Sequence, residues 1–216
     1  MRPNLAQVLN TLAHEIRTPL AVSQGYLKLY LDGRLTNPGD QQRAFQQTRD
    51  ALGAIATLCN DMGRVSTLSE SPSPAFGEKL AAADFLARLR EAGEAAGATW
   101  SGDAPGAAVE AHNARDLVQA AAIVADAAFD EAREEPRVFR AHGDGALTVL
   151  AGAGTAIEAL AAGPDAAGAC AVNFTRGGKG LKLIWAAFVL EQHRVRTWSH
   201  QDHRATVGFR FPLVHA

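Results

Sequence analysis

The amino-terminal third of the chain contains two long stretches of helical periodicity, separated only by a short turn. From Leu5 to Leu31, apolar residues recur at spacings of three, four and seven, the pattern of an amphipathic helix. The same periodicity returns over 40–69, while Gly33, Pro38 and Gly39 between the two stretches favour a turn. The two predicted helices therefore form a long antiparallel hairpin.

An isolated hairpin of this kind leaves much of its apolar surface uncovered. Each helix has one apolar stripe, and two copies of the hairpin can cover both stripes by pairing into a four-helix bundle. The sequence thus predicts a homodimer. The stripe positions are Leu5, Val8, Leu9, Leu12, Ile16, Leu20, Leu27 and Leu31 in the first helix, and Phe45, Thr48, Leu52, Ile55, Cys59, Met62 and Val65 in the second.

A short polar segment with two prolines, residues 69–74, follows the hairpin, and the composition then becomes rich in alanine and glycine. We therefore expect one domain over 1–69 and a second over 75–216. In the second domain, the patterns predict four helices, at 82–97, 112–134, 157–160 and 181–190. They also predict two β-hairpins, at 138–150 and 195–211. This mixture indicates an α+β fold, a helical hairpin followed by a two-layer α/β sandwich.

Length and charge exclude several classes of protein. The 216 residues suffice for one large domain or two small ones, and a net charge of −2 provides no general attraction for nucleic acid. No apolar run reaches the 18 or so residues of a membrane span, so we expect a cytoplasmic protein without a membrane segment. The two cysteines are far apart, which favours neither a disulfide framework nor a zinc site.

A group of polar residues lies on the first predicted helix, away from its apolar stripe. His14 is two residues from both Leu12 and Ile16, so its side chain projects about 200° from theirs. Glu15 is adjacent to His14 in sequence, and Thr18 follows one turn later on the same face. A neutral imidazole is a good nucleophile towards a phosphoryl group, a carboxylate can take a proton, and a hydroxyl can position water.

Residues 14–20 read HEIRTPL, which closely resembles the phospho-acceptor motif of sensor histidine kinases. The surrounding hairpin resembles the dimerisation and phosphotransfer domain of that family. The resemblance implies that His14 is phosphorylated and that Glu15 is its acid/base partner. It also implies that Thr18, with Glu15, supports dephosphorylation of a partner, the receiver domain of a response regulator.

The second half resembles the ATP-binding domain of the same family, most clearly near its end. Gly178 and Gly180 open a stretch similar to the glycine box GxGLGL, in which Lys182 replaces a glycine. Gly152 and Gly154 fit an earlier box, DxGxG, in which a leucine replaces the aspartate. The resemblance makes these four glycines candidate nucleotide-binding residues of a degenerate site.

The asparagine box NLxxNA of that family is also damaged. The alignment places Ile123 and Ala127 where two asparagines belong, and an aliphatic side chain offers no ligand to Mg²⁺. Asp126 and Asp144 are the nearest carboxylates, but one is a residue off the pattern and the other suits a hairpin turn. We therefore expect no cofactor, with ATP and Mg²⁺ binding only in an active kinase.

Three interpretations follow from an intact histidine motif beside a damaged nucleotide site. The leading one is a histidine phosphotransferase that carries phosphate on His14 to and from receiver-domain aspartates. The second is an active sensor histidine kinase that phosphorylates His14 with ATP. The third is a non-catalytic module that binds a response regulator.

Overall fold

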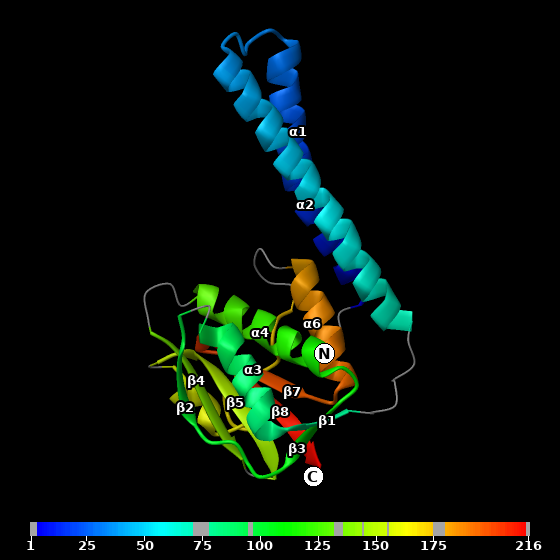
Figure 1. Cartoon of the computed structure of the whole chain (residues 1–216). Helices are drawn as coiled ribbons and strands as arrows, with labels where there is room; N and C mark the ends of the chain where they lie inside the picture. The colour runs from blue at the N-terminus through cyan, green and yellow to red at the C-terminus, as the bar shows by residue number, and fades with distance from the viewer. Residues whose placement is uncertain are drawn as a thin grey trace.

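A computed structural model describes residues 4–70, 78–94, 97–131, 136–143, 145–154, 156–174 and 180–214. Its first part is the predicted hairpin, made of α1 (Leu5–Leu31) and α2 (Pro38–Glu70), which extends away from a mixed α/β part (Figure 1). Asn4 begins α1 with a capping box: its side chain accepts from the Gln7 N–H at 2.9 Å, and the Gln7 side chain accepts from the Asn4 N–H. The Asn37 side chain similarly accepts from the Gly39 N–H at 2.7 Å, so α2 begins slightly earlier than predicted.

Small residues of the two helices, among them Ser23, Ala44 and Ala51, are buried, and the Tyr30 ring of α1 meets the Phe45 ring of α2 with centroids 5.0 Å apart. Much of the predicted stripe stays uncovered: Leu52 is 54% exposed and Phe45 is 48% exposed. Cys59, predicted on the stripe, is exposed as well. In the described part of the chain, the large exposed apolar residues all lie on α1 and α2; they are Leu5, Leu9, Leu20, Val22, Leu27, Tyr30, Leu31, Phe45 and Leu52.

The α/β part is built on one mixed sheet of eight strands with the main order β1-β3-β8-β5-β4-β2. Strand β7 pairs with β8, and β6 pairs with β7. The β2–β4 pair is parallel and the others are antiparallel. The strands are β1 (Glu78–Ala81), β2 (Thr99–Gly102), β3 (Ala108–Ala111), β4 (Arg137–Gly143), β5 (Ala146–Ala153), β6 (Ala169–Cys170), β7 (Arg196–His200) and β8 (His203–Val214).

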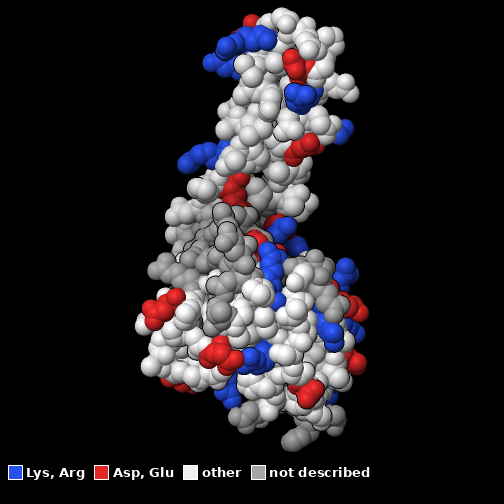
Figure 2. All heavy atoms as spheres, turned by 90° about the vertical axis from the view of Figure 1, so that its left-hand side faces the viewer, with Lys and Arg blue, Asp and Glu red and all other residues white. Residues whose placement is uncertain are grey.

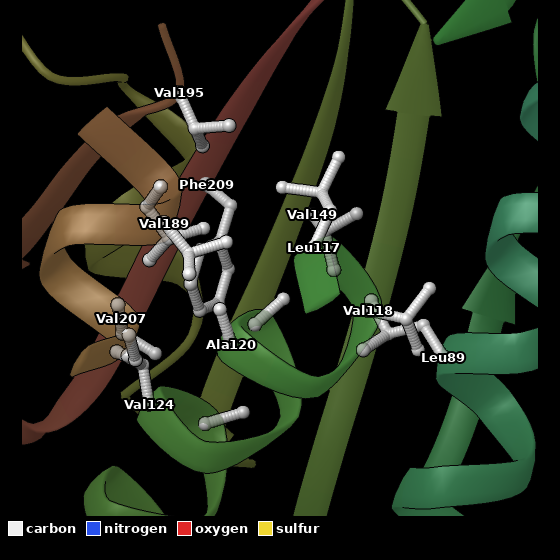
Figure 3. Close-up of a cluster of buried hydrophobic side chains, with 14 of the residues drawn as sticks. Leu89, Leu117, Val118, Ala120, Val124, Val149, Val189, Val195, Val207 and Phe209 are labelled. Atoms are coloured by element: carbon white, nitrogen blue, oxygen red, sulfur yellow. The ribbon is translucent and has the colours of Figure 1, made fainter. Parts of the chain in front are cut away.

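Three helices cover one face of this sheet: α3 (Ala82–Glu94), α4 (Ala114–Glu131) and α6 (Gly180–Gln192). Leu117 and Val124 of α4 and Val189 of α6 meet Val149 of β5 and Phe209 of β8 in the core between the layers (Figure 3). A short helix, α5 (Glu158–Ala161), packs with Trp198 in a separate small cluster. The predicted two-layer arrangement is thus confirmed, whereas Gly97 lies in a turn outside α3 and α4 begins two residues later than predicted.

The hairpin and the α/β part share a packed junction. Val8 of α1 and Val65 of α2 belong to the same buried cluster as the residues of α4 and α6. The Arg64 guanidinium lies over the Trp185 ring at 4.1 Å from its centroid, and an Arg64 nitrogen is 3.8 Å from a carboxylate oxygen of Asp116. Cation–π and charge contacts of this kind hold α2 against α4 and α6.

His193 joins the end of α6 to the start of α4 inside the protein. Its Nδ1–H donates to the Val189 carbonyl at 2.7 Å, so its Nε2 accepts from the His112 N–H at 3.1 Å. The side chain is 2% exposed, and this burial lowers the pKa of His193 because a charged imidazole loses hydration there. His193 is therefore held in its neutral form.

We expect His193→Ala to lower the free energy of unfolding by about 2–4 kcal/mol, because a buried ring and its hydrogen bonds to Val189, His112 and Asn113 are lost. The unfolded imidazole takes up a proton that the native one resists. The stabilisation by His193 is therefore present above its ordinary pKa of 6.5 and is lost as the pH falls below it. Urea unfolding at pH 8 and pH 5.5 measures both effects.

His142→Ala is the matched control, because His142 is exposed at the end of β4. An equal loss of stability in both variants, or a difference between them that does not shrink at low pH, would contradict this role of His193.

Candidate functional site

A long open groove of about 1240 Å³ follows one face of the hairpin. Eight of its lining residues come from α1, seven from α2 and one from α6. They are Gln7, Asn10, Thr11, His14, Glu15, Thr18, Pro19, Val22, Gln47, Asp50, Ala51, Ala54, Thr57, Leu58, Asp61 and Lys182. The three predicted catalytic residues therefore share one cavity.

His14 lies in this groove with an exposed side chain, as its position off the apolar stripe predicts. Thr18 is exposed one turn further along α1 and lines the same groove. Pro19 also lines it and lies inside α1. The imidazole and the hydroxyl are thus both accessible to a large partner that enters the groove.

Glu15 is different, because it turns towards α6. The Leu181 N–H donates to its Oε2 at 3.4 Å. In the described part of the chain, the Glu15 Oε1 is buried without a hydrogen-bond partner, and so is the Oδ2 of Asp61. Burial raises the pKa of Glu15, and the Asp61 carboxylate raises it further; the Leu181 N–H and the charge of His14 act in the opposite direction. A carboxyl group with this preference for a proton suits an acid/base partner.

We expect Glu15→Gln to stabilise the protein at neutral pH relative to the wild type. A raised native pKa means that the native state loses stability as the pH rises above about 4.5, where the unfolded carboxyl ionises, and glutamine removes that loss. The advantage of the variant should shrink as the pH falls towards 4.5. Thermal unfolding across pH 4–8 measures it, and an advantage that is independent of pH would contradict the assignment.

Most groove residues did not emerge from the sequence as members of the site, among them Asp61 and Lys182. Asp61 comes from the last third of α2, and Lys182 comes from the first turn of α6. For Asp61, the sequence did contain a signal, because Asp50, Ala54 and Asp61 are spaced so that they lie on one face of α2. Lys182 appeared only as a departure from the glycine box.

The described candidate nucleotide-binding glycines, Gly152, Gly154 and Gly180, do not line this groove and have packing roles. A side chain at Gly152 would collide with Thr206 on the neighbouring strand β8. The Gly154 N–H donates to the Pro136 carbonyl at 3.0 Å. Gly180 faces Glu15 and Thr11 so closely that an added Cβ would collide with both. Gly178 lies outside the described residues.

The two asparagine positions of α4 hold no ligand for Mg²⁺. Ile123 and Ala127 stand at the asparagine positions, and both pack against the apolar core. Leu150, at the aspartate position, is fully buried with Trp198 in the cluster on the other face of the sheet, whereas its neighbour Val149 joins the core under α4. Among the described residues, no group of three His, Cys, Asp or Glu side chains could hold a metal ion.

The described surface carries charges of both signs, and the described helices do not meet the requirements of a membrane span. In the view of Figure 2, basic and acidic side chains alternate along the hairpin and do not form one patch of a single sign. In the part of the chain that the structure describes, no helix is both long and apolar enough to cross a bilayer.

Comparison with known proteins identifies the helical hairpin. Residues 4–70 match the family model "His Kinase A (phospho-acceptor) domain". The chain is also 32% identical over 84 residues to the phosphate regulon sensor protein PhoR of Pseudomonas aeruginosa. That match covers 39% of this chain and 19% of PhoR, so it spans about a fifth of the relative.

Solved histidine kinases share the fold of the whole chain. The Acinetobacter baumannii histidine kinase AdeS superposes with a TM-score of 0.57 at 16% identity, over 93% of this chain and 98% of that one. Full-length ShkA, solved in complex with AMPPNP, superposes with a TM-score of 0.55 at 17% identity, over 96% of this chain and 46% of that one. Residues 4–70 thus match a His Kinase A (phospho-acceptor) domain that contains the HEIRTPL motif, and the chain as a whole shares the fold of solved histidine kinases.

Proposed function

We propose that the protein is a histidine phosphotransferase of a two-component phosphorelay, with His14 as the residue that carries the phosphoryl group. The carrying observation is that His14 is exposed in an open groove beside Glu15 and Thr18, while Ile123 and Ala127, at the two asparagine positions of α4, offer no ligand to Mg²⁺. A site of this kind can exchange phosphate with an acyl phosphate, which needs no nucleotide.

The transfer step follows from the chemistry of the two partners. A nitrogen of the His14 ring attacks the phosphorus of a phosphorylated receiver aspartate. The P–N bond forms, the P–O bond to the aspartate breaks, and the aspartate leaves as a carboxylate. The other ring nitrogen keeps its hydrogen during this step, and Glu15 is the nearby base that accepts it afterwards. The reverse reaction passes the group to a second receiver.

Thr18 has a separate role in the proposal. Its hydroxyl lies in the groove one turn from His14, where it can position water near a receiver that is docked there. With Glu15 it would support hydrolysis of the acyl phosphate on the receiver. The groove thus serves as the docking surface for a receiver domain.

The homodimer belongs to the same proposal. The hairpin has two broad faces, of which one is the groove and the other carries Leu9, Leu20 and Leu27 on α1 and Phe45 and Leu52 on α2. Exposed leucines that follow one face of a helix at helical spacing are a seam for another helix. A second copy supplies the same stripe through two-fold symmetry and completes a four-helix bundle.

An active kinase is the second candidate. The fold of ShkA, which was solved with AMPPNP, supports it, because the α/β part of this chain has the same architecture. In that case Mg²⁺ and ATP would bind beside α4 and α6. The division into a phosphotransfer domain over 1–69 and a degenerate ATPase-like domain over 75–216 serves both candidates; in the phosphotransferase the second domain helps to dock the receiver.

One experiment separates the candidates. The pure protein is offered radiolabelled Mg²⁺–ATP, or a panel of receiver domains carrying radiolabelled phosphate, and the products are separated on a gel. Labelling from a receiver without labelling from ATP supports the phosphotransferase. Labelling from ATP establishes the kinase, and a complex with a receiver without any labelling establishes the non-catalytic module.

A further inference from the structure

The first turn of α6 is fixed against the phospho-acceptor face of α1. Gly180 sits directly on Glu15 and Thr11, and the Leu181 N–H donates to the Glu15 carboxylate at 3.4 Å. The Leu181 side chain is fully buried in the common core of the two parts. Lys182 is the next residue, and its exposed side chain lines the groove that contains His14.

The residues that line the groove carry an unbalanced set of charges, and Arg17, one turn from His14 on α1, is not among them. The acidic lining residues of the groove are Asp50, Asp61 and Glu15, whereas Lys182 is the single lysine or arginine among its lining residues. No ion pair joins Lys182 to a carboxylate in the part of the chain that the structure describes. A phosphoryl group brings a charge of about −1.5 to −2 into this acidic surrounding. It therefore requires a cation that is not already neutralised.

We propose that Lys182 is a catalytic residue of the phosphotransfer reaction, and that its ammonium group binds the phosphoryl oxygens while the group moves to and from His14. This inference rests on the proposed function, because it assigns a residue to that same site. Lys182 exchanges no proton: it offsets charge on the oxygens as the P–O bond breaks and the P–N bond forms. A lysine suits the task as a compact charge on a flexible stem.

The placement of Lys182 also links the α/β part to the chemistry. The residue belongs to α6, whereas His14, Glu15 and Thr18 belong to α1. The α/β part thus contributes a side chain that binds the phosphoryl oxygens, and it also helps to dock the receiver. Loss of its contact with α1 should remove that group from the site.

The test uses a small phosphoryl donor as well as receivers. Phosphoramidate phosphorylates an imidazole directly: the new P–N bond forms and ammonia leaves. The variants are Lys182→Gln and Lys182→Arg, with Lys79→Gln as the matched control, because Lys79 is an exposed lysine on β1 outside the groove. The pKa of the phosphoryl group on His14 is followed by ³¹P NMR, and transfer from receivers is followed by radiolabel.

We expect Lys182→Gln to raise the pKa of the phosphoryl group on His14 by at least about half a unit, because a nearby cation favours the dianion. Transfer from receivers should slow by about tenfold or more. Lys182→Arg should restore most of both effects, and Lys79→Gln should match the wild type. Circular dichroism confirms that each variant is folded.

The outcomes separate this inference from the function on which it rests. Equal phosphoryl pKa values in wild type and Lys182→Gln would overturn the role of Lys182, and so would equal transfer rates with normal labelling from receivers. Failure of phosphoramidate to label His14 would also overturn it. A shifted phosphoryl pKa without labelling from any receiver would uphold Lys182 as a phosphoryl-binding residue and would refute the phosphotransferase.

Discussion

The His14→Ala variant should take up no phosphate from any phosphorylated receiver, a loss of at least about a thousandfold in rate. The imidazole is the attacking group in the proposed step, so its removal eliminates the bond that forms. The nearest groove side chains, Glu15 and Thr18, do not replace it, because a hydroxyl is a weak nucleophile and a phosphorylated carboxyl is hydrolysed rapidly. Gel separation of radiolabelled protein after incubation with the receiver panel measures the loss.

His142→Ala is again the control, since it removes an exposed histidine from β4 and leaves the groove intact. It should label like the wild type. Retention of label in His14→Ala would show that phosphate is carried elsewhere on the chain and would end the assignment of His14.

Replacing Leu52 with glutamate should convert the proposed dimer into a monomer. Burial of a leucine side chain contributes about 1.5–3 kcal/mol, and two-fold symmetry places the change in the interface twice. The glutamate also carries a charge into an apolar seam. We therefore expect the dissociation constant to rise by at least about a hundredfold. Analytical ultracentrifugation over a range of protein concentrations measures it.

Val22→Glu is the matched variant, because Val22 is also exposed on the hairpin but lines the groove on its other side. This variant should remain a dimer while its labelling by receivers falls. A monomeric wild type at micromolar concentration, or loss of the dimer only in Val22→Glu, would show that the groove and not the Leu52 face is where two copies meet.

The long helices and the late strands could be predicted from the sequence because their signals are local. The hairpin has periodic apolar residues over more than three turns in each helix, and β4 and β5 flank a glycine turn at Gly145, whose φ is +62°. Strands β1, β2 and β3 were missed. Each has four residues, and they pair with strands far away in sequence, so four positions carry too little alternation to reveal them.

In the candidate site, too, the residues close together in sequence could be predicted, whereas the contact between distant residues could not. His14, Glu15 and Thr18 lie within five consecutive positions, so a motif on one helix was enough to place them together. The approach of α6 was not predictable, because Glu15 and Leu181 are 166 positions apart. Pairing at that distance depends on how Val8, Val65 and the apolar residues of α6 pack, and no local pattern encodes it.

Strand β8 has a consequence for how the protein is made. It pairs with β3, β5 and β7, and yet it is the last of the eight strands to leave the ribosome. The hairpin of α1 and α2 can form during synthesis from local contacts, whereas the β1–β3 pair and the β5–β4–β2 group are joined into one sheet only by β8. Until β8 is in place, the apolar residues of α4 and α6 that pack on it stay uncovered, and the nascent chain is prone to aggregate. The synthesis of β8, and not the folding of the hairpin, therefore sets the moment when the sheet beneath α6 can be completed.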